Sequence, residues 1–304
     1  MSRSLVNWLL FISLSVIWGS SFILMKGGML RLSAFQVASL RIIFAGLVLL
    51  PWGLKYIREI PKNKLGLIFL SGTFGSLIPA YLFCLAEQKV DSALAGTLNS
   101  LTPIFVLITG VLFFRSKVAA NKFFGIIIAI IGSILLLVSK QSADSKANFY
   151  YGSLIVIATL FYGYNVNMVH QYLKHIGSLK IAAVALSLCA LPALAVLGFT
   201  GFFNINFSAP GYLISIFYTF LLGVLGTAVA TILFYMLLKR AGAVFGSMVT
   251  YGIPVVANIW GIIYGEEVGV IQFLCLLFIL AGVYITNANL KIKVNSESEF
   301  EKTH

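Results

Sequence analysis

Several hydrogen-bonding side chains lie inside segments of this 304-residue sequence that are otherwise apolar. Polar groups at membrane depth are costly, so each is a candidate for binding a solute. Asn99 and Thr250 precede Pro103 and Pro254 by four residues, where a proline frees a backbone carbonyl. Asn258 follows Pro254 by one helical turn on the same face. Either these groups line a cavity, or the prolines only kink helices that hydrogen-bond to one another.

The segment over residues 150–170 is the most polar of the apolar segments and carries several amides and phenols. Tyr162 and Asn165 are three residues apart and share a helix face. A helix surrounded by lipid would avoid such groups, so one side must meet protein or water. Aromatic walls are common in ligand pockets, although a single aromatic also fits ordinary packing. We predict that the substrate-binding residues are Asn99, Tyr162, Asn165, Tyr251, Asn258, Trp18 and Tyr81, with Tyr235 as a further aromatic candidate.

Arg41 is the one charged residue well inside an apolar segment. One interpretation is a contact to an anionic group of a substrate, such as a carboxylate. The other is an arginine that reaches the membrane surface or braces neighbouring helices.

Patterns for covalent catalysis and metal binding are absent from the sequence. Phosphate-binding loops, nucleophile elbows and HExxH motifs do not occur. His170 and His175 are five residues apart, not the four of a helical metal pair. The three cysteines show no CxxC spacing, and no acidic residue lies mid-segment. We therefore expect no enzyme, no cofactor, no metal site and no usual carboxylate proton relay.

The composition is that of a membrane protein. The chain is 60% hydrophobic and 10% charged with a mean hydropathy of +1.00, whereas soluble domains carry about 25% charged residues. The net charge of +12 is spread over short connections rather than a basic run, which argues against nucleic acid as a partner and for the lipid bilayer. A spanning helix needs about 20 apolar residues. We expect ten of them, near 5–26, 34–54, 65–86, 93–113, 122–139, 150–170, 180–203, 211–238, 243–264 and 270–289.

The basic residues predict the orientation of these segments. With the N-terminus in the cytoplasm, 15 Lys and Arg residues fall inside and 5 outside. Because cytoplasmic connections carry the excess of positive charge, we expect both termini to be cytoplasmic in an inner or plasma membrane.

The stretch from Phe69 to Pro103 occurs twice, at a constant offset of 151 residues. The residues 69–76 return as 220–227, and Pro103 returns as Pro254. Such a match is typical of an internal duplication. We predict five transmembrane helices in 1–140, five in 148–290, and a disordered cytoplasmic tail over 291–304. Because five is odd, the second copy must insert upside down, as in many transporters with a site between their halves.

Charge at equivalent positions agrees with the inversion. Arg115 and Lys117 end the fourth segment, whereas Glu266 and Glu267 end the ninth. Gly-x-x-x-Gly pairs at 242/246 and 261/265 fit close helix approach, with homodimer contact as the weaker alternative.

Three short motifs remain, and they are Trp18-Gly19-Ser20-Ser21-Phe22, Arg41-Ile42-Ile43-Phe44-Ala45, and Glu266 followed by Gly282. They give the chain, in two copies, a resemblance to the EamA-type branch of the drug/metabolite transporter superfamily. This resemblance implies ten helices as two inverted repeats, a central cavity and transport of a small metabolite. Because Arg41 and Glu266 belong to signatures shared across the family, we predict a structural or gating role for them and for the two prolines, Pro103 and Pro254.

The sequence therefore predicts an all-α integral membrane transporter of small metabolites, such as amino acids or related compounds, that works by alternating access. The alternative is a membrane-embedded enzyme acting on lipid-linked substrates, which would need clustered acids, histidines or a nucleophile near one interface. A structural or regulatory membrane subunit is the third hypothesis.

Overall fold

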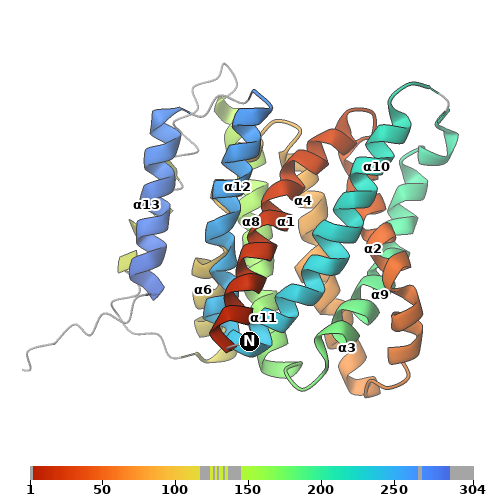
Figure 1. Cartoon of the computed structure of the whole chain (residues 1–304), viewed down its shortest axis with the longest axis horizontal. Helices are drawn as coiled ribbons and strands as arrows, with labels where there is room; N and C mark the ends of the chain where they lie inside the picture. Colours follow the sequence, from red (N-terminus) through yellow and green to blue (C-terminus); the bar gives the residue numbers. More distant parts are fainter. Residues whose placement is uncertain are drawn as a thin grey trace, which may run out of the picture.

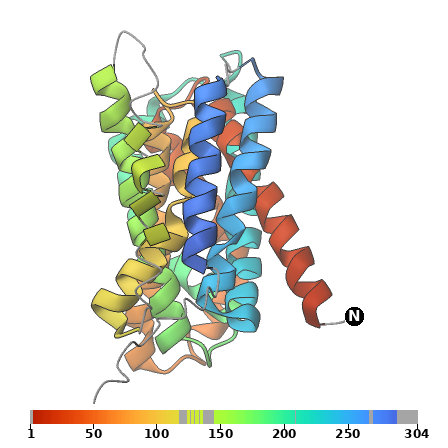
Figure 2. The same ribbon diagram turned by 90° about the vertical axis from the view of Figure 1, so that its left-hand side faces the viewer.

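The computed structural model describes residues 3–116, 124–125, 127–128, 130–132, 134–135, 145–207, 209–265 and 269–287. These residues are helical apart from short connections, and none of them is in a strand. The predicted all-α class is therefore confirmed. The helices form one bundle and run along a shared direction (Figures 1 and 2).

The first half of the chain forms a series of helices joined by short connections. They are α1 (Arg3–Met29), α2 (Ala34–Tyr56), α3 (Lys62–Gly72), the π-helix η1 (Thr73–Leu77), α4 (Ile78–Ala86), α5 (Ser92–Asn99) and α6 (Thr102–Phe114). The residues described between 124 and 135 are also helical. The second half holds α8 (Ser145–Tyr172), α9 (Ser178–Phe199), the short 3-10 helix η2 (Phe202–Asn204), α10 (Tyr212–Gly223), the π-helix η3 (Val224–Val229), α11 (Ala230–Ser247), α12 (Val249–Ile263) and α13 (Val270–Asn287).

The bundle is built to face lipid. Its described part holds eight helices that are long and apolar enough to cross a membrane, and a shorter apolar stretch at Phe273–Gly282. Their outer faces expose large apolar side chains such as Leu112 (69%) and Phe113 (62%), which a soluble monomer would rarely do over so wide a surface. Half of the predicted fifth segment, 122–139, and the whole tail 291–304 lie outside the described residues.

The two π-helices occupy equivalent positions of the repeated stretch. Thr73 begins η1 and Val224 begins η3, and these residues are 151 positions apart. Each interrupts a long spanning helix, 62–86 in the first copy and 212–243 in the second. In Figure 1 the first of these helices rises from α3 to α4, while the second descends from α10 to α11. The two copies of this helix thus run in opposite directions, as an inverted repeat requires.

Contacts between the copies also occur in equivalent pairs. A Cβ on Gly19 would lie 2.5 Å from Cβ of Val256, and a Cβ on Gly163 would lie 2.5 Å from the carbonyl carbon of Phe105. Phe105 and Val256 are separated by 151 residues, and the two glycines by 144. The first helix of each copy therefore packs against the fourth helix of the other copy.

The second helix of each copy, α2 or α9, lies at the centre of this arrangement. A Cβ on Gly46 of α2 would be 2.7 Å from Cβ of Ala190 in α9, its own equivalent at the 144-residue offset. A residue that contacts its own equivalent lies near an axis of approximate two-fold symmetry. These contacts support the predicted relation between the two copies.

The short connections gather at two ends of the bundle. At one end Lys180 contacts Glu59 at 2.6 Å, Lys239 donates to the carbonyl of Ile176, and Arg240 Nε donates to Asn7 Oδ1 at 3.2 Å. This end holds the basic connections and the N-terminus (Figure 1). At the other end Gln36 Nε2 donates to the carbonyl of Thr200 at 3.2 Å. The basic connections of both halves therefore share one side.

Pro103 differs from the predicted mid-span position, whereas Pro254 lies inside a helix as predicted. The span ending at Phe114 is broken, because α5 stops at Asn99 and α6 begins at Thr102 with Pro103 in its first turn. The Thr102 hydroxyl donates to the freed Asn99 carbonyl at 2.8 Å. Pro254 lies inside α12, and the freed Thr250 carbonyl accepts from Ser100 Oγ at 3.4 Å. Each proline-freed carbonyl is thus bonded by a nearby hydroxyl.

Candidate functional site

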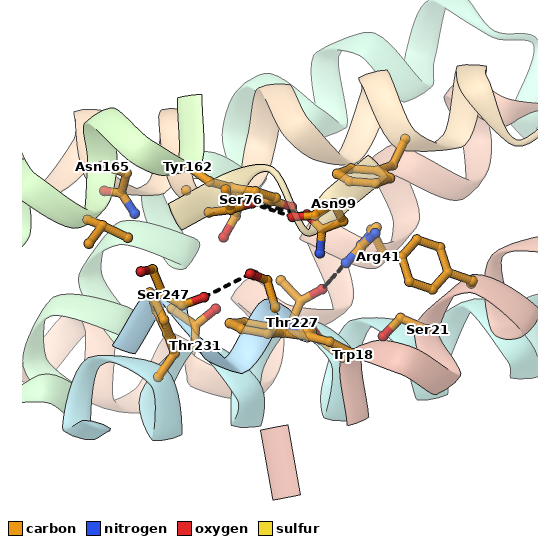
Figure 3. A pocket seen from close by; sticks show the side chains of 18 of the residues that line it. Trp18, Ser21, Arg41, Ser76, Asn99, Tyr162, Asn165, Thr227, Thr231 and Ser247 are labelled. Carbon is orange, nitrogen blue, oxygen red and sulfur yellow. Dashed lines mark hydrogen bonds between the residues drawn. The ribbon is translucent and has the colours of Figure 1, made fainter. Parts of the chain in front are cut away.

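A cavity lies between the two copies, and side chains from both copies line it (Figure 3). The cavity has a volume of about 90 Å³. One water needs about 10–15 Å³ of such volume, so the cavity has room for several waters or a small solute. The lining comes from α1, α2, η1, α4, α5, α6 and α8, and from η3, α11 and α12.

Much of the lining consists of equivalent positions in the two copies. At offsets of 144 or 151 residues the cavity is lined by the pairs Trp18/Tyr162, Ser21/Asn165, Phe22/Val166, Gly75/Gly226, Ser76/Thr227, Phe83/Phe234 and Asn99/Thr250. The duplication thus places the same set of positions on both sides of one space. Where the paired residues differ, the two walls offer a solute different chemistry.

Aromatic side chains form two equivalent contacts at the cavity wall. The rings of Trp18 and Phe234 lie 5.2 Å apart between centroids, and those of Tyr162 and Phe83 lie 6.1 Å apart. Trp18 Nε1 donates to the carbonyl of Gly226 at 3.1 Å. Gly226 lies inside η3, where the π-helical turn changes the backbone bonding. Trp18 therefore ties α1 of the first copy to the π-helix of the second.

Arg41 reaches the cavity from α2 and is held by the same π-helix. Its Nε and Nη2 lie 3.2 and 3.1 Å from Thr227 Oγ1, and Nη1 lies 3.5 Å from Met25 Sδ. The Thr227 hydroxyl donates in turn to the Leu222 carbonyl at 3.2 Å. The lone pairs of the Thr227 oxygen can therefore accept from the Arg41 guanidinium. Because Thr227 belongs to η3, this π-helix fixes the position of the guanidinium (Figure 3).

Two asparagines bring amides to the cavity. Asn99, at the end of α5, is 6% exposed, and its Oδ1 lies 3.4 Å from Thr102 Oγ1. Asn165 in α8 is 3% exposed and packs against Gly75 of η1. Asn165 Oδ1 is buried and has no hydrogen-bond partner in the structure. The amides therefore bring both donor and acceptor groups to the cavity.

The structure brings some of the predicted substrate-binding residues together and leaves others apart. Trp18, Asn99, Tyr162 and Asn165 line the cavity, as does the further candidate Tyr235. Their role in binding a substrate stays a prediction.

Tyr81, Tyr251 and Asn258 are not among the lining residues. The Tyr81 hydroxyl is 2.8 Å from Ser39 Oγ, and Tyr251 packs against the hydrophobic core. Asn258 Nδ2 donates to the carbonyl of Pro254 in its own helix at 2.7 Å. Each is engaged in packing or in a hydrogen bond outside the cavity, so we do not include these three in the proposed site.

Sequence reasoning did not assign the hydroxyl groups of the cavity. Ser76, Thr227, Thr231, Thr102 and Ser247 all line it. A signal existed for the first two, because they are the last residues of the repeated stretches 69–76 and 220–227. It was ambiguous because serine and threonine in membrane helices also serve packing.

The predicted structural residues have mixed outcomes. Arg41 both braces η3 and lines the cavity, so its position is compatible with either interpretation. Pro103 and Pro254 lie in the helices next to the cavity-lining residues Thr102 and Thr250. Glu266 lies outside the described residues. Within the part of the chain that the structure describes, no three His, Cys, Asp or Glu residues gather as a metal site would require.

The profile of the EamA-like transporter family matches residues 6–138 and again residues 151–288. The chain belongs to the EamA-like transporter family. The family resemblance predicted from the sequence is thus confirmed. A protein named only as an uncharacterized transporter of Archaeoglobus fulgidus is 27% identical over 92% of this chain and 98% of its own. Protein PagO of Salmonella typhimurium is 23% identical over 95% of each chain.

A solved crystal structure has the same fold as this EamA-family chain. It matches with a TM-score of 0.63 at 15% identity and covers 94% of this chain and 97% of the other. Family membership, transporter-named relatives and the apolar helices identify this protein as a multi-pass membrane transporter.

Proposed function

We propose that this EamA-family protein moves small metabolites, such as amino acids or related compounds, through the central cavity by alternating access. The observation that carries the proposal is the cavity itself, which is lined by equivalent positions of two copies of one fold. In transporters built from inverted repeats, one half rocks against the other about a site between them. Gly19 contacts Val256, and Gly163 contacts Phe105, so each contact joins one copy to the other. A rocking motion of the copies would break and re-form contacts of this kind.

The chemistry of the lining suits a small amphipathic solute. Aromatic rings of Trp18, Tyr162 and Phe83 offer apolar contact, and Asn99 and Asn165 offer hydrogen bonds. Pockets of this kind bury most of a ligand in apolar walls and fix its orientation through a few polar groups. No aspartate or glutamate is among the lining residues of the described part, so we propose no carboxylate-based proton coupling.

We also propose the cell membrane as the location, with both termini in the cytoplasm. The basic connections of both halves share one end of the bundle, through the contacts of Lys180 with Glu59 and of Lys239 with Ile176. The excess of lysine and arginine in these connections supports a cytoplasmic location for this end.

Transport by variants with one polar group removed tests the proposal. We expect Asn99→Leu to slow the counterflow of radiolabelled amino acids into proteoliposomes about fivefold or more, since one hydrogen bond to a solute contributes about 1 kcal/mol. Asn258→Leu is the matched control, because it makes the same change outside the cavity and should transport like the natural protein. Transport no better than in empty liposomes for the whole amino-acid panel, or equal rates in the two variants, would contradict the proposal.

A further inference from the structure

Arg41 brings a positive charge to the cavity that no lining carboxylate of the described part balances. Its hydrogen bonds go to neutral acceptors, the Thr227 hydroxyl and the Met25 thioether. A guanidinium carries five N–H donors in a planar fork that matches a carboxylate. Arg41 is only partly exposed and lines the cavity, and a charge in such a low-dielectric space attracts an ion of opposite sign strongly. An anion in the cavity would therefore balance the charge of Arg41.

The guanidinium is also present on one side of the cavity only. At the offset of 144 residues that relates α2 to α9, the residue equivalent to Arg41 is Ala185. Ala185 is buried at 1% exposure and its carbonyl faces Gly72 of α3. The two copies are therefore alike in fold and unlike in charge at this position. A solute in the cavity meets a cationic end and a neutral end.

The position of the Arg41 side chain is fixed before any solute arrives. The Thr227 oxygen accepts from two of its nitrogens, and the Thr227 hydroxyl donates its proton to the carbonyl of Leu222 in α10. Preorganised donors bind an anion more tightly because less freedom is lost on binding. The bonds of Arg41 to Thr227 and Met25 use three of its five N–H donors, and no bond of Arg41 to a backbone carbonyl or a carboxylate occurs in the described structure.

A second and independent observation lies at the opposite end of the cavity (Figure 3). Asn165 Oδ1 is buried, 97% of its residue is covered, and it has no hydrogen-bond partner. An unpaired acceptor in a buried site is unfavourable, because it has lost its hydrogen bonds to water without gaining others. In a cavity-lining residue that loss is compensated when a bound solute donates to the oxygen.

We infer that the cavity binds a carboxylate-bearing solute whose anionic group pairs with Arg41 and whose other end donates a hydrogen bond to Asn165 Oδ1. The inference rests on the proposed transport function and assigns a chemical class to its substrate. It also assigns Arg41 to anion binding rather than to bracing alone. Thr227 is then a positioning residue, because it acts on the solute through Arg41.

Thermal stabilisation of the full-length protein in lipid nanodiscs by matched solute pairs tests this assignment. The probes are 4-hydroxybutanoate with 4-hydroxybutanamide, 6-aminohexanoate with 6-aminohexanamide, and L-leucine with L-leucinamide. The natural protein should be stabilised by at least one carboxylate at about tenfold lower concentration than by its amide, because hydrogen bonds to charged groups are worth about 1.5–3 kcal/mol. Arg41→Gln should abolish that preference, and Arg41→Lys should retain part of it.

Three further variants separate binding from folding. Arg31→Gln removes an arginine from an exposed turn outside the cavity and should leave the preference unchanged. Thr227→Val keeps the charge of Arg41, removes its acceptor and should weaken the carboxylate preference. Asn165→Leu should keep the carboxylate preference but lose any advantage of 4-hydroxybutanoate over butanoate.

The assignment is overturned if no carboxylate is preferred by the natural protein, or if Arg41→Gln retains the preference. Should Arg41→Gln not fold, an unaltered preference in Thr227→Val overturns it instead. Accessibility of the cavity from both sides of the membrane, measured without any solute, would in that case still support transport.

Discussion

At the scale of single residues, the cavity is lined by side chains that have two tasks. Trp18 presents its ring to the cavity and donates to the Gly226 carbonyl inside η3. Arg41 faces the same space and bonds to Thr227 in the same π-helix. The groups that a solute would meet therefore also hold the first copy to the second. We therefore expect binding of a solute to be coupled to the contacts between the copies through these residues.

The Trp18 hydrogen bond provides a direct stability prediction. Trp18→Phe keeps an aromatic ring but removes the donor to Gly226, so we expect it to lower stability by about 1 kcal/mol and the unfolding midpoint by a few degrees. The measurement is thermal unfolding in detergent micelles. Trp8→Phe is the control, because Trp8 is 52% exposed. A midpoint for Trp18→Phe equal to that of the control would show that the bond to η3 does not contribute.

The sequence predicted the large polar groups of the cavity better than the small ones. Asn99 and Asn165 stand out in apolar segments because amides there need a partner. Thr227 does not stand out, since its hydroxyl bonds to a carbonyl of its own helix and such bonding is common for threonine. Asn258 was predicted to line the cavity for a related reason. Its bond to the Pro254 carbonyl is local and cannot be distinguished by residue type.

At the scale of elements, the π-helices η1 and η3 stand out as the features that the two copies share at the cavity. They contribute Gly75 and Ser76 from one copy, and Gly226 and Thr227 from the other. π-Helical turns are often found at functional sites. The repeated sequence predicted that the two stretches would be alike. It could not predict the π-helical form, because a single added residue per turn leaves no mark in hydrophobic periodicity.

Close packing between elements depends on glycines at the crossing points. Gly163 lets α8 approach the backbone of Phe105 in α6. A Cβ there would lie 2.5 Å from a carbonyl carbon, and backbone cannot move aside as a flexible side chain can. We therefore expect Gly163→Ala to destabilise the protein by about 1–3 kcal/mol, as overpacking does.

A matched substitution provides the comparison for Gly163→Ala. Gly66 lies in α3, and a Cβ added there would have no neighbouring atom within 4 Å, so Gly66→Ala should be neutral or stabilising by up to about 1 kcal/mol. Thermal unfolding of the two variants checks both values. If Gly163→Ala unfolds at the same temperature as Gly66→Ala, the crossing of α8 and α6 is not tightly packed.

At the scale of the whole molecule, one arrangement accounts for the fold and the site together. Two copies of a helical unit face each other, and the first helix of each packs against the fourth helix of the other. The cavity lies between them and is lined by residues of both copies. The constant offset in the sequence predicted the duplication, and the odd number of spans predicted the inversion. The sequence could not predict the offset of 144 residues in the first two helices, because so few of their residues match.

The asymmetry of the cavity is the other property of the whole molecule. Two equivalent walls would recognise a solute with two equivalent ends. Here Arg41 of the first copy lines the cavity, whereas the equivalent residue of the second copy, Ala185, is a buried alanine outside the lining. A solute with one anionic end would therefore keep a single orientation as the copies rock. Duplication followed by divergence of a few lining residues is sufficient to produce this selectivity.

The central claim is that the cavity opens alternately to the two sides of the membrane, and cysteine accessibility tests it most directly. Ser76→Cys, with the three natural cysteines replaced by alanine, places one thiol in the cavity. A membrane-impermeant sulfonated methanethiosulfonate is added to right-side-out and to inside-out vesicles. Arg58→Cys and Asn204→Cys report the two ends, which we expect to be cytoplasmic and external. The account predicts that the thiol introduced by Ser76→Cys is modified in both kinds of vesicle, and modification in only one kind, or in neither, would contradict it.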